Sequence, residues 1–328
     1  MHSPCDFPLT RRRWLATALV AHAGYAAAQT AFPSRPITLV VPFAPGGIAD
    51  VTARAVAQEM GASLQQPIVI DNRPSAGAIV GASLVAQAQP DGHTMLLLSN
   101  ANAVSVGLFR KLPFDVQRDF APVTTLGYFD LALFVAHGSP WRNVGDVIAQ
   151  ARARPGRITI GTIAGGSTQH LAAELFKSMA QLDLVIVPYK GTPAVTTALR
   201  VGEIDLAVEI LGPMLAQLGA QAVRALAVTS ERRFAGLPLV PTVQESGLPG
   251  YVAASWNGLA LPARTPEPVV QRLRQAAHAA LALPAVQSQL QALGVRAQGS
   301  SGEQLQQLLA SEIRRWSDVI RAAGIERQ

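Results

Sequence analysis

The stretch ITLVVPFAPGGIADVTARAVAQEMG, residues 37–61, has the pattern of a strand, a tight loop and a helix. Its first five residues are apolar or β-branched. After the loop, apolar residues recur at helical spacing up to Gly61, for which the pattern predicts a C-terminal cap. Gly46 and Gly47 stand at the predicted helix entry. Because a helix N-terminus has free backbone N–H groups and a partial positive charge, this entry favours an anionic ligand.

A second stretch repeats the arrangement in the middle of the chain. Residues 158–161 predict a strand, residues 162–168 a loop with the pair Gly165-Gly166, and residues 169–176 a helix. In open α/β sheets, ligands bind outside the carboxyl ends of the strands. We therefore expect two α/β domains, each of which directs a helix N-terminus into a shared cleft.

The rest of the chain alternates apolar runs with helical patterns, which is typical of an α/β fold with largely parallel sheets. The expected strands are 37–41, 68–71, 94–98, 132–135, 158–161, 184–188, 205–208, 225–228 and 258–261. The expected helices are 49–60, 79–88, 144–153, 169–180, 194–201, 213–218, 266–283, 284–293 and 302–323. Residues 129–138 and 256–262 are interpreted as strands that cross between the domains. Domain 1 is then 29–127 plus 256–328, and domain 2 is 128–255.

The N-terminal residues 1–28 have the pattern of a secretory signal peptide. Three arginines at 11–13 precede a short apolar run and the tract Ala26-Ala27-Ala28. The arginines also fit the twin-arginine export pattern, so both the Sec and twin-arginine routes stay open. The only cysteine, Cys5, lies in this segment. We expect an exported, periplasmic protein without disulfides.

Composition and motifs exclude several kinds of activity. Aromatic residues are only 5% of the chain, and the net charge of +6 is scattered, which argues against nucleic-acid binding. The first glycine loop lacks the lysine of a P-loop and the spacing of a dinucleotide fingerprint. The sequence has no G-x-S-x-G elbow, and its histidines after residue 28 stand singly. We therefore expect no catalytic residues, no cofactor and no metal.

The candidate binding segments are rich in small polar residues and in backbone amides. They are residues 43–47, Ser99-Asn100 with the two residues after them, 162–168 and 188–191. Hydrogen bonds to a charged group contribute about 1.5–3 kcal/mol each, so four or five suffice for about micromolar binding. A small carboxylate fits such a site. Glu209, just after a predicted strand, is a further candidate, either to contact a ligand amine or hydroxyl or to face water.

From residue 32 to the end, the sequence resembles the tripartite tricarboxylate transporter substrate-binding proteins, the Bug family. The resemblance rests on the motifs FPSRPITLVVPFAPGGIAD (32–50), DNRP (71–74), GGSTQHL (165–171), VPYKG (187–191), LAVT (226–229), VPTVQESG (240–247) and WNGL (256–259) with PARTP (262–266). It implies a two-domain periplasmic-binding-protein fold of the Venus flytrap, type II-like kind. It also implies an extracytoplasmic receptor that holds a small carboxylate without a salt bridge.

Carried over position by position, the resemblance implies two walls and a flank for the ligand cleft. The first wall is Phe43, Ala44, Gly46, Gly47 and Asp50, and the second is Ala164, Gly166, Ser167, Thr168 and His170. Ser99 and Asn100, with Tyr189 and Lys190, would flank the cleft. Asp50 has the alternative of capping its own helix, Tyr189 of packing, and Lys190 of standing in solvent.

Three functions stay open at this point. The first is capture of the carboxylate for the membrane subunits of a tripartite transporter. The second is a ligand sensor that feeds a signalling protein. The third is a periplasmic enzyme that uses Asp50, His170 or Lys190 as an acid or base. A monomer is expected in each case.

Overall fold

The computed structural model describes residues 32–163 and 167–328, and residues Arg35–Gln328 form one compact unit. The predicted signal peptide, and Ala164 and Gly166 of the predicted site, lie outside the described residues. The strands are β1 (Ile37–Val41), β2 (Ile68–Asn72), β3 (Thr94–Ser99), β4 (Phe120–Ala136), β5 (Ile158–Ile163), β6 (Leu184–Tyr189), β7 (Leu206–Ile210), β8 (Val223–Val228), β9 (Ala254–Pro262) and β10 (Val295–Ala297).

The helices are α2 (Ile48–Leu64), α3 (Ile79–Ala86), α4 (Asn100–Leu108), α5 (Val144–Ala153), α6 (Thr168–Met179), α7 (Thr192–Val201), α8 (Leu211–Gly219), α9 (Glu267–Ala282), α10 (Pro284–Ala292) and α11 (Gly302–Ala322), with a 3₁₀ turn, η2 (Ala76–Ala78), before α3. Helices and strands alternate along most of the chain, which confirms the predicted α/β class.

The strands form a mixed sheet in the order β2-β1-β3-β9-β4-β7-β5-β6, with β8 and β10 also paired to β4. Strands β1, β2 and β3 pair in parallel, as do β5, β6 and β7. Every antiparallel pair among the described strands contains β4 or β9. The sheet therefore contains more antiparallel strand pairs than the predicted largely parallel sheets would have. The reason is that these two long strands connect the two parallel groups.

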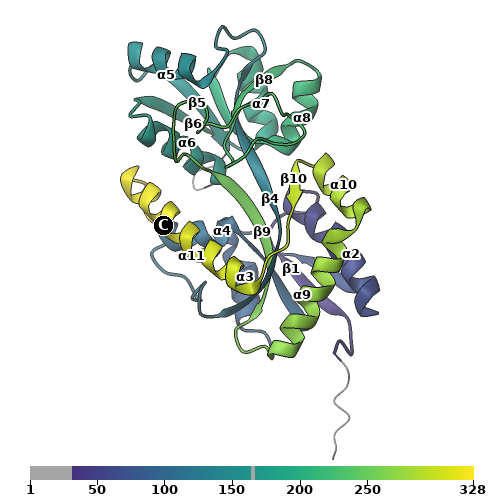
Figure 1. Cartoon of the computed structure of the whole chain (residues 1–328). Helices are drawn as coiled ribbons and strands as arrows, with labels where there is room; N and C mark the ends of the chain where they lie inside the picture. The colour runs from purple at the N-terminus through teal and green to yellow at the C-terminus, as the bar shows by residue number, and fades with distance from the viewer. Residues whose placement is uncertain (1–31, 164–166) are drawn as a thin grey trace, which may run out of the picture. The chain divides into compact units, whose positions relative to one another are not determined.

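Strand β4 is the longest of the described strands, with 17 residues. Its first part pairs with β9 (Figure 1), and its last part pairs with β7 and β8. Strands β4 and β9 include most of the predicted strand 129–138 and all of the predicted strand 256–262. Their crossing between two domains stays a prediction. The domain boundaries at residues 128 and 255 stay a prediction.

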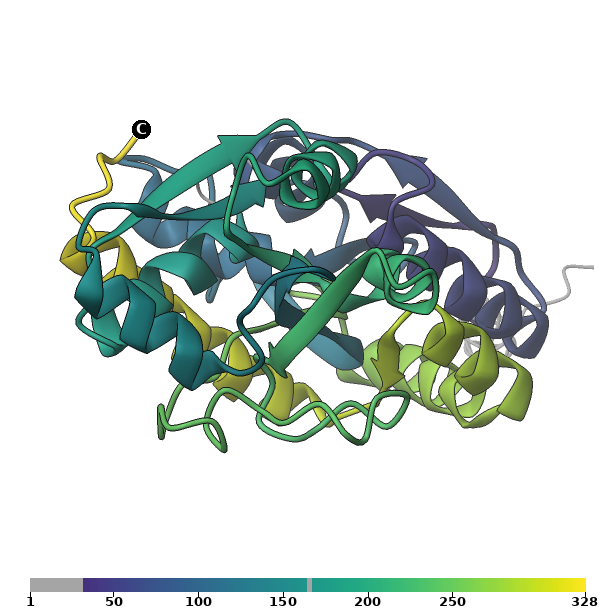
Figure 2. The same ribbon diagram turned by 90° about the horizontal axis from the view of Figure 1, so that it is seen from above.

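Helices cover the sheet and bury its apolar side chains. Helices α9 and α10 pack beside α2 (Figure 2). Helix α11 packs on α4 and β4, and it also contacts α6. Trp316 of α11 is fully buried, as are Trp256 of β9 and Leu96–Leu98 of β3. The apolar core therefore ties the C-terminal helices to both glycine-loop helices.

Several predicted elements have different bounds. Gly61 does not end α2; the helix continues to Leu64, and Gln65 takes the left-handed conformation with φ 55°. A Cβ at position 61 would lie 3.2 Å from the Gln66 carbonyl oxygen, so the glycine instead permits the chain to fold back closely. Residues 100–102, predicted only as part of a binding segment, begin helix α4, and neither this helix nor the short strand β10 was predicted.

Candidate functional site

The first glycine loop joins β1 to α2 and leaves the N-terminus of that helix without a side-chain cap. Gly46 has φ +78°, a conformation that favours glycine. Gly47 is the N-cap residue in extended conformation, and no side chain among the described residues caps α2 there. The first-turn N–H groups of α2 are therefore suited to an acceptor supplied by a ligand.

Asp50 holds this loop in shape. Its carboxylate accepts from Gly46 N, Arg54 Nε and Asn72 Nδ2, each at 2.9 Å. Asn72 Nδ2 also donates to the Phe43 carbonyl oxygen at 3.0 Å. Burial alone would raise the pKa of Asp50, but the hydrogen bonds from Arg54, Gly46 and Asn72 outweigh it and lower that pKa. With three donors already bound, Asp50 has a clear structural role.

The start of α4 contributes a second N-terminus. Ser99 and Asn102 form a capping box, in which Ser99 N donates to Asn102 Oδ1 at 3.0 Å. Asn100, fully buried, donates from Nδ2 to Thr168 Oγ1 at 3.0 Å. Its Oδ1 accepts from Trp316 Nε1 at 2.8 Å. Asn100 therefore links the starts of α4 and α6 and the middle of α11.

The start of α6 is capped by Ser167, whose Oγ accepts from His170 N at 3.1 Å. The imidazole of His170 lies 3.8 Å from Glu174, one turn along the helix. Burial lowers the pKa of His170, and Glu174 opposes this shift in part. The side chain is thus directed along its own helix, and its role as a ligand contact stays a prediction.

The start of α8 lies beside a buried carboxyl group. Glu209, fully buried at the end of β7, accepts from Thr192 Oγ1 at 2.9 Å and from Gln169 Nε2 at 3.3 Å. Its Oε1 has no hydrogen-bond partner among the described residues. Burial raises the pKa of Glu209, and the bonds from Thr192, Gln169 and Ile210 N oppose that shift. The hydrogen bond from Gln169 therefore connects Glu209 to the candidate site.

These four helix starts border one cavity of about 360 Å³. It is lined by Phe43, Ala44, Gly47, Ile48, Ala49, Ser99, Ala101, Val104, Phe129, Ile163, Ser167, Thr168, Gln169, Ile210, Ser255 and Asn257. Each glycine loop contributes residues to this wall, as do strands β4 and β9. The arrangement can offer backbone amides from several sides to one small ligand.

Six of the predicted site residues line this cavity, namely Phe43, Ala44, Gly47, Ser99, Ser167 and Thr168. Gly46, Asp50, Asn100, His170, Tyr189, Lys190 and Glu209 are not among its lining residues. Tyr189 donates to Glu203 Oε1 at 2.8 Å; burial first, and then this carboxylate, raise the pKa of Tyr189 to about 12. Lys190 is exposed. The ligand contacts of all these residues stay predictions.

Sequence reasoning missed much of the apolar wall and the two polar residues of β9. Ser255 and Asn257 are two positions apart on a strand, so their side chains share one face. The two-residue spacing of these polar side chains within a predicted strand could have identified them as candidate site residues. Phe129 and Ile210 had none, because an apolar residue at a strand end is usually part of the core.

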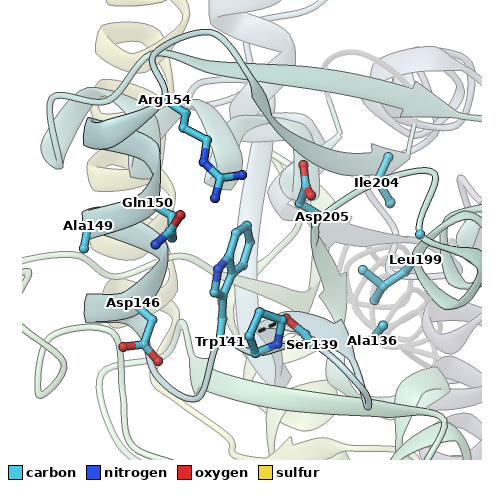
Figure 3. Close-up of a pocket in the computed structure, with 12 residues that line it drawn as sticks. Ala136, Ser139, Trp141, Asp146, Ala149, Gln150, Arg154, Leu199, Ile204 and Asp205 are labelled. Atoms are coloured by element: carbon cyan, nitrogen blue, oxygen red, sulfur yellow. Dashed lines mark hydrogen bonds between the residues drawn. The ribbon is translucent and has the colours of Figure 1, made fainter.

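A larger cavity of about 590 Å³ shares no lining residue with the first (Figure 3). The side chains of Trp141, Arg154 and Asp205 lie around it. The Asp205 carboxylate already accepts from the Thr159 backbone N–H and hydroxyl, at 2.9 and 2.8 Å. No helix N-terminus with an open first turn lines this second space in the described chain, so the smaller cavity is the candidate site.

Within 32–163 and 167–328, no group of three or more His, Cys, Asp or Glu side chains is placed to hold a metal ion. Over the same ranges, none of the helices has the length and apolar character needed to span a bilayer.

Comparison with known proteins agrees with this geometry. The model of the tripartite tricarboxylate transporter family receptor matches residues 52–325. Protein BugT of Bordetella pertussis is 34% identical over 309 residues, 93% of this chain and 95% of BugT. A solved R. palustris protein with adipate superimposes with TM-score 0.79 at 35% identity, covering 90% of this chain and 100% of that one. MatC from Rhodopseudomonas palustris, with bound malate, gives TM-score 0.75 at 33% identity, covering 88% and 100%.

The fold and the cavity between its helix starts define a solute-binding protein of the periplasmic-binding-protein class. The chain belongs to the tripartite tricarboxylate transporter family of receptors, as the resemblance in its motifs predicted.

Proposed function

We propose that this protein captures a small organic carboxylate outside the cytoplasm and delivers it to the membrane subunits of a tripartite transporter. The observation that carries the proposal is the convergence of four helix starts on one small cavity. Anions bind at such N-termini through backbone N–H groups and the helix dipole. The carboxylate ligands of the two Rhodopseudomonas structures are consistent with this choice.

The protein acts by binding and not by turnover. Asp50, one of the three acid–base candidates of the sequence, is bound to three donors and serves the loop. The protein is located in the periplasm. It is exported there through the N-terminal signal of residues 1–28, by the Sec or twin-arginine route. It works as a monomer. Capture closes the protein on its solute, so the ligand binds the closed form more tightly.

Thermal unfolding of the purified protein, refolded to remove bound ligand, tests the proposal. The panel pairs each acid with its amide. Ligand at 100 times its Kd adds about 2.7 kcal/mol to the free energy of unfolding, a rise of several degrees in Tm. An acid that raises Tm while its amide does not is the expected result. A shift with amides alone, or consumption of the acid during incubation, contradicts the proposal.

A matched pair of variants tests the role of the α2 N-terminus. Gly47→Asp places an N-cap carboxylate where it accepts from the first-turn N–H groups and repels an anion. A Cβ at Gly47 meets only the Ala44 carbonyl oxygen, at 3.5 Å, so the side chain has room. Gly47→Asp should abolish the acid-induced shift, and Gly47→Ala should keep it. Equal shifts in both variants would contradict an anion at this helix start.

A further inference from the structure

The wall of the 360 Å³ cavity is built for an apolar body. Its described residues are all uncharged, and six carry large apolar side chains: Phe43, Ile48, Val104, Phe129, Ile163 and Ile210. They come from five different segments of the fold, so the apolar surface surrounds the space. The volume lies near the lower end of the about 300–1,000 Å³ typical of small-molecule sites.

Most polar side chains of the wall are already bound within the protein. Ser167 Oγ donates to the Ile163 carbonyl oxygen at 3.3 Å and accepts from His170 N. Gln169 Nε2 donates to Glu209, and Thr168 Oγ1 accepts from Asn100. These bonds fix the side chains in place, and they leave few side-chain donors in the described wall for a second charged group of a ligand.

Asn257 differs from these residues. It lies on β9, opposite Ser99 of β3, and its side chain is 1% exposed. Its Nδ2 is buried and has no hydrogen-bond partner among the described residues, although Asn257 lines the cavity. A buried donor without a partner is unfavourable, so an oxygen atom supplied by a ligand would remove a real penalty.

We propose that the cavity takes an acid with a single carboxylate on a compact apolar body, an oxygen of which accepts a hydrogen bond from Asn257 Nδ2. This inference rests on the proposed carboxylate capture and narrows its ligand class. A second carboxylate would be buried among the apolar side chains with few side-chain donors left to it, which is costly. The ligand class therefore differs from that of the neighbours solved with adipate and malate.

Matched pairs of acids distinguish a failure of this inference from a failure of the proposed carboxylate capture. Calorimetric titration compares hexanoate with adipate, which have the same chain length, and benzoate with terephthalate. The monocarboxylates hexanoate and benzoate should bind about tenfold more tightly, or better, than the matching dicarboxylates adipate and terephthalate. Diacids that bind as well as or better than the single acids overturn this inference and leave carboxylate capture standing. Acids that all fail to bind overturn both.

Two variants test the proposed role of Asn257 as a hydrogen-bond donor to the ligand. Asn257→Leu removes the donor at similar volume, and Asn257→Asp replaces it with a carboxylate; each should weaken the best single acid about tenfold or more. The control is Thr52→Val, since Thr52 Oγ1 is also buried without a partner among the described residues but Thr52 does not line the cavity. Thr52→Val should leave the Kd unchanged. Unchanged affinity in folded Asn257 variants overturns the assignment.

Discussion

Asn100 at the start of α4 donates a hydrogen bond from Nδ2 to Oγ1 of Thr168 at the start of α6, over 3.0 Å. The two residues are 68 positions apart in the chain. The same amide accepts from Trp316 of α11. A single buried side chain thus sets the separation of two helix starts that border the ligand cavity.

Replacing Thr168 tests this link. Thr168→Val keeps the shape of the side chain but leaves Asn100 Nδ2 without its acceptor, so the free energy of unfolding should fall by about 1–3 kcal/mol. Thr168→Ser retains the hydroxyl and should stay much closer to the wild type. Urea denaturation measures both. Equal stability of the valine variant and the wild type would show that the link contributes nothing.

Replacing Asp50 should weaken the first glycine loop in a pH-dependent way. The folded-state pKa of Asp50 lies below its ordinary value of 3.8, so its contribution is present above that value and is lost as pH falls through the folded pKa. Asp50→Asn should cost about 1–3 kcal/mol at pH 7, and the two proteins should approach each other in stability as pH falls below 3.8 and through the folded pKa.

The control for Asp50 is Asp71→Asn. Asp71 pairs with Arg73 at 2.9 Å, but the arginine is 51% exposed, and surface pairs contribute about 0–1 kcal/mol. Urea unfolding at pH 7 and pH 3 measures the free energy of unfolding of the wild type and of both variants. A loss for Asp50→Asn that is the same at both pH values would contradict the charge-based explanation.

Glu209 should show the opposite dependence on pH. Burial raises its folded pKa above the ordinary value of 4.5, so the stability that it contributes is lost as pH rises from 4.5 through the folded value. Glu209→Gln keeps an oxygen acceptor for Thr192 but does not ionise. The variant should therefore match or exceed the wild-type Tm at pH 8 and lose stability less steeply between pH 4.5 and 8.

Exposed Glu203, which accepts from Tyr189, provides the comparison for Glu209. Glu203→Gln should leave the slope of Tm against pH unchanged. A steeper slope in Glu209→Gln than in the wild type would refute the buried-acid explanation.

Gly212 should be intolerant of any side chain. A Cβ there would clash with the Leu293 carbonyl oxygen, a backbone atom, and Gly294 packs against the same point. Gly212→Ala should lower the free energy of unfolding by about 1–3 kcal/mol through overpacking. Gly219, at the end of the same helix, has open space around its Cβ position.

Gly219→Ala is therefore the matched control, and it should be neutral or stabilise by about 0.5–1 kcal/mol. Both variants are compared by thermal unfolding. Equal effects of the two alanines would mean that the contact of Gly212 with Leu293 and Gly294 has enough freedom to move.

Local sequence patterns determined most elements of this fold and both glycine-loop helix entries. The apolar run 37–41 and the periodic residues after Gly47 are sufficient for β1 and the start of α2, because period and turn chemistry act over a few residues. The same reasoning failed at Gly61, where the glycine permits the following chain to pack closely and does not cap the helix.

Only the tertiary structure decided which residues meet. Asp50 is a potential ligand contact in the sequence, yet its partner Asn72 arrives from another strand and gives it a structural role. Phe129, Ile210 and Asn257 become neighbours in one wall because β4, β7 and β9 come together in the fold. The sequence by itself determined an anion-favouring helix entry, since a helix N-terminus is a local feature. The apolar character of the cavity depends on long-range packing, so the tertiary structure alone revealed it.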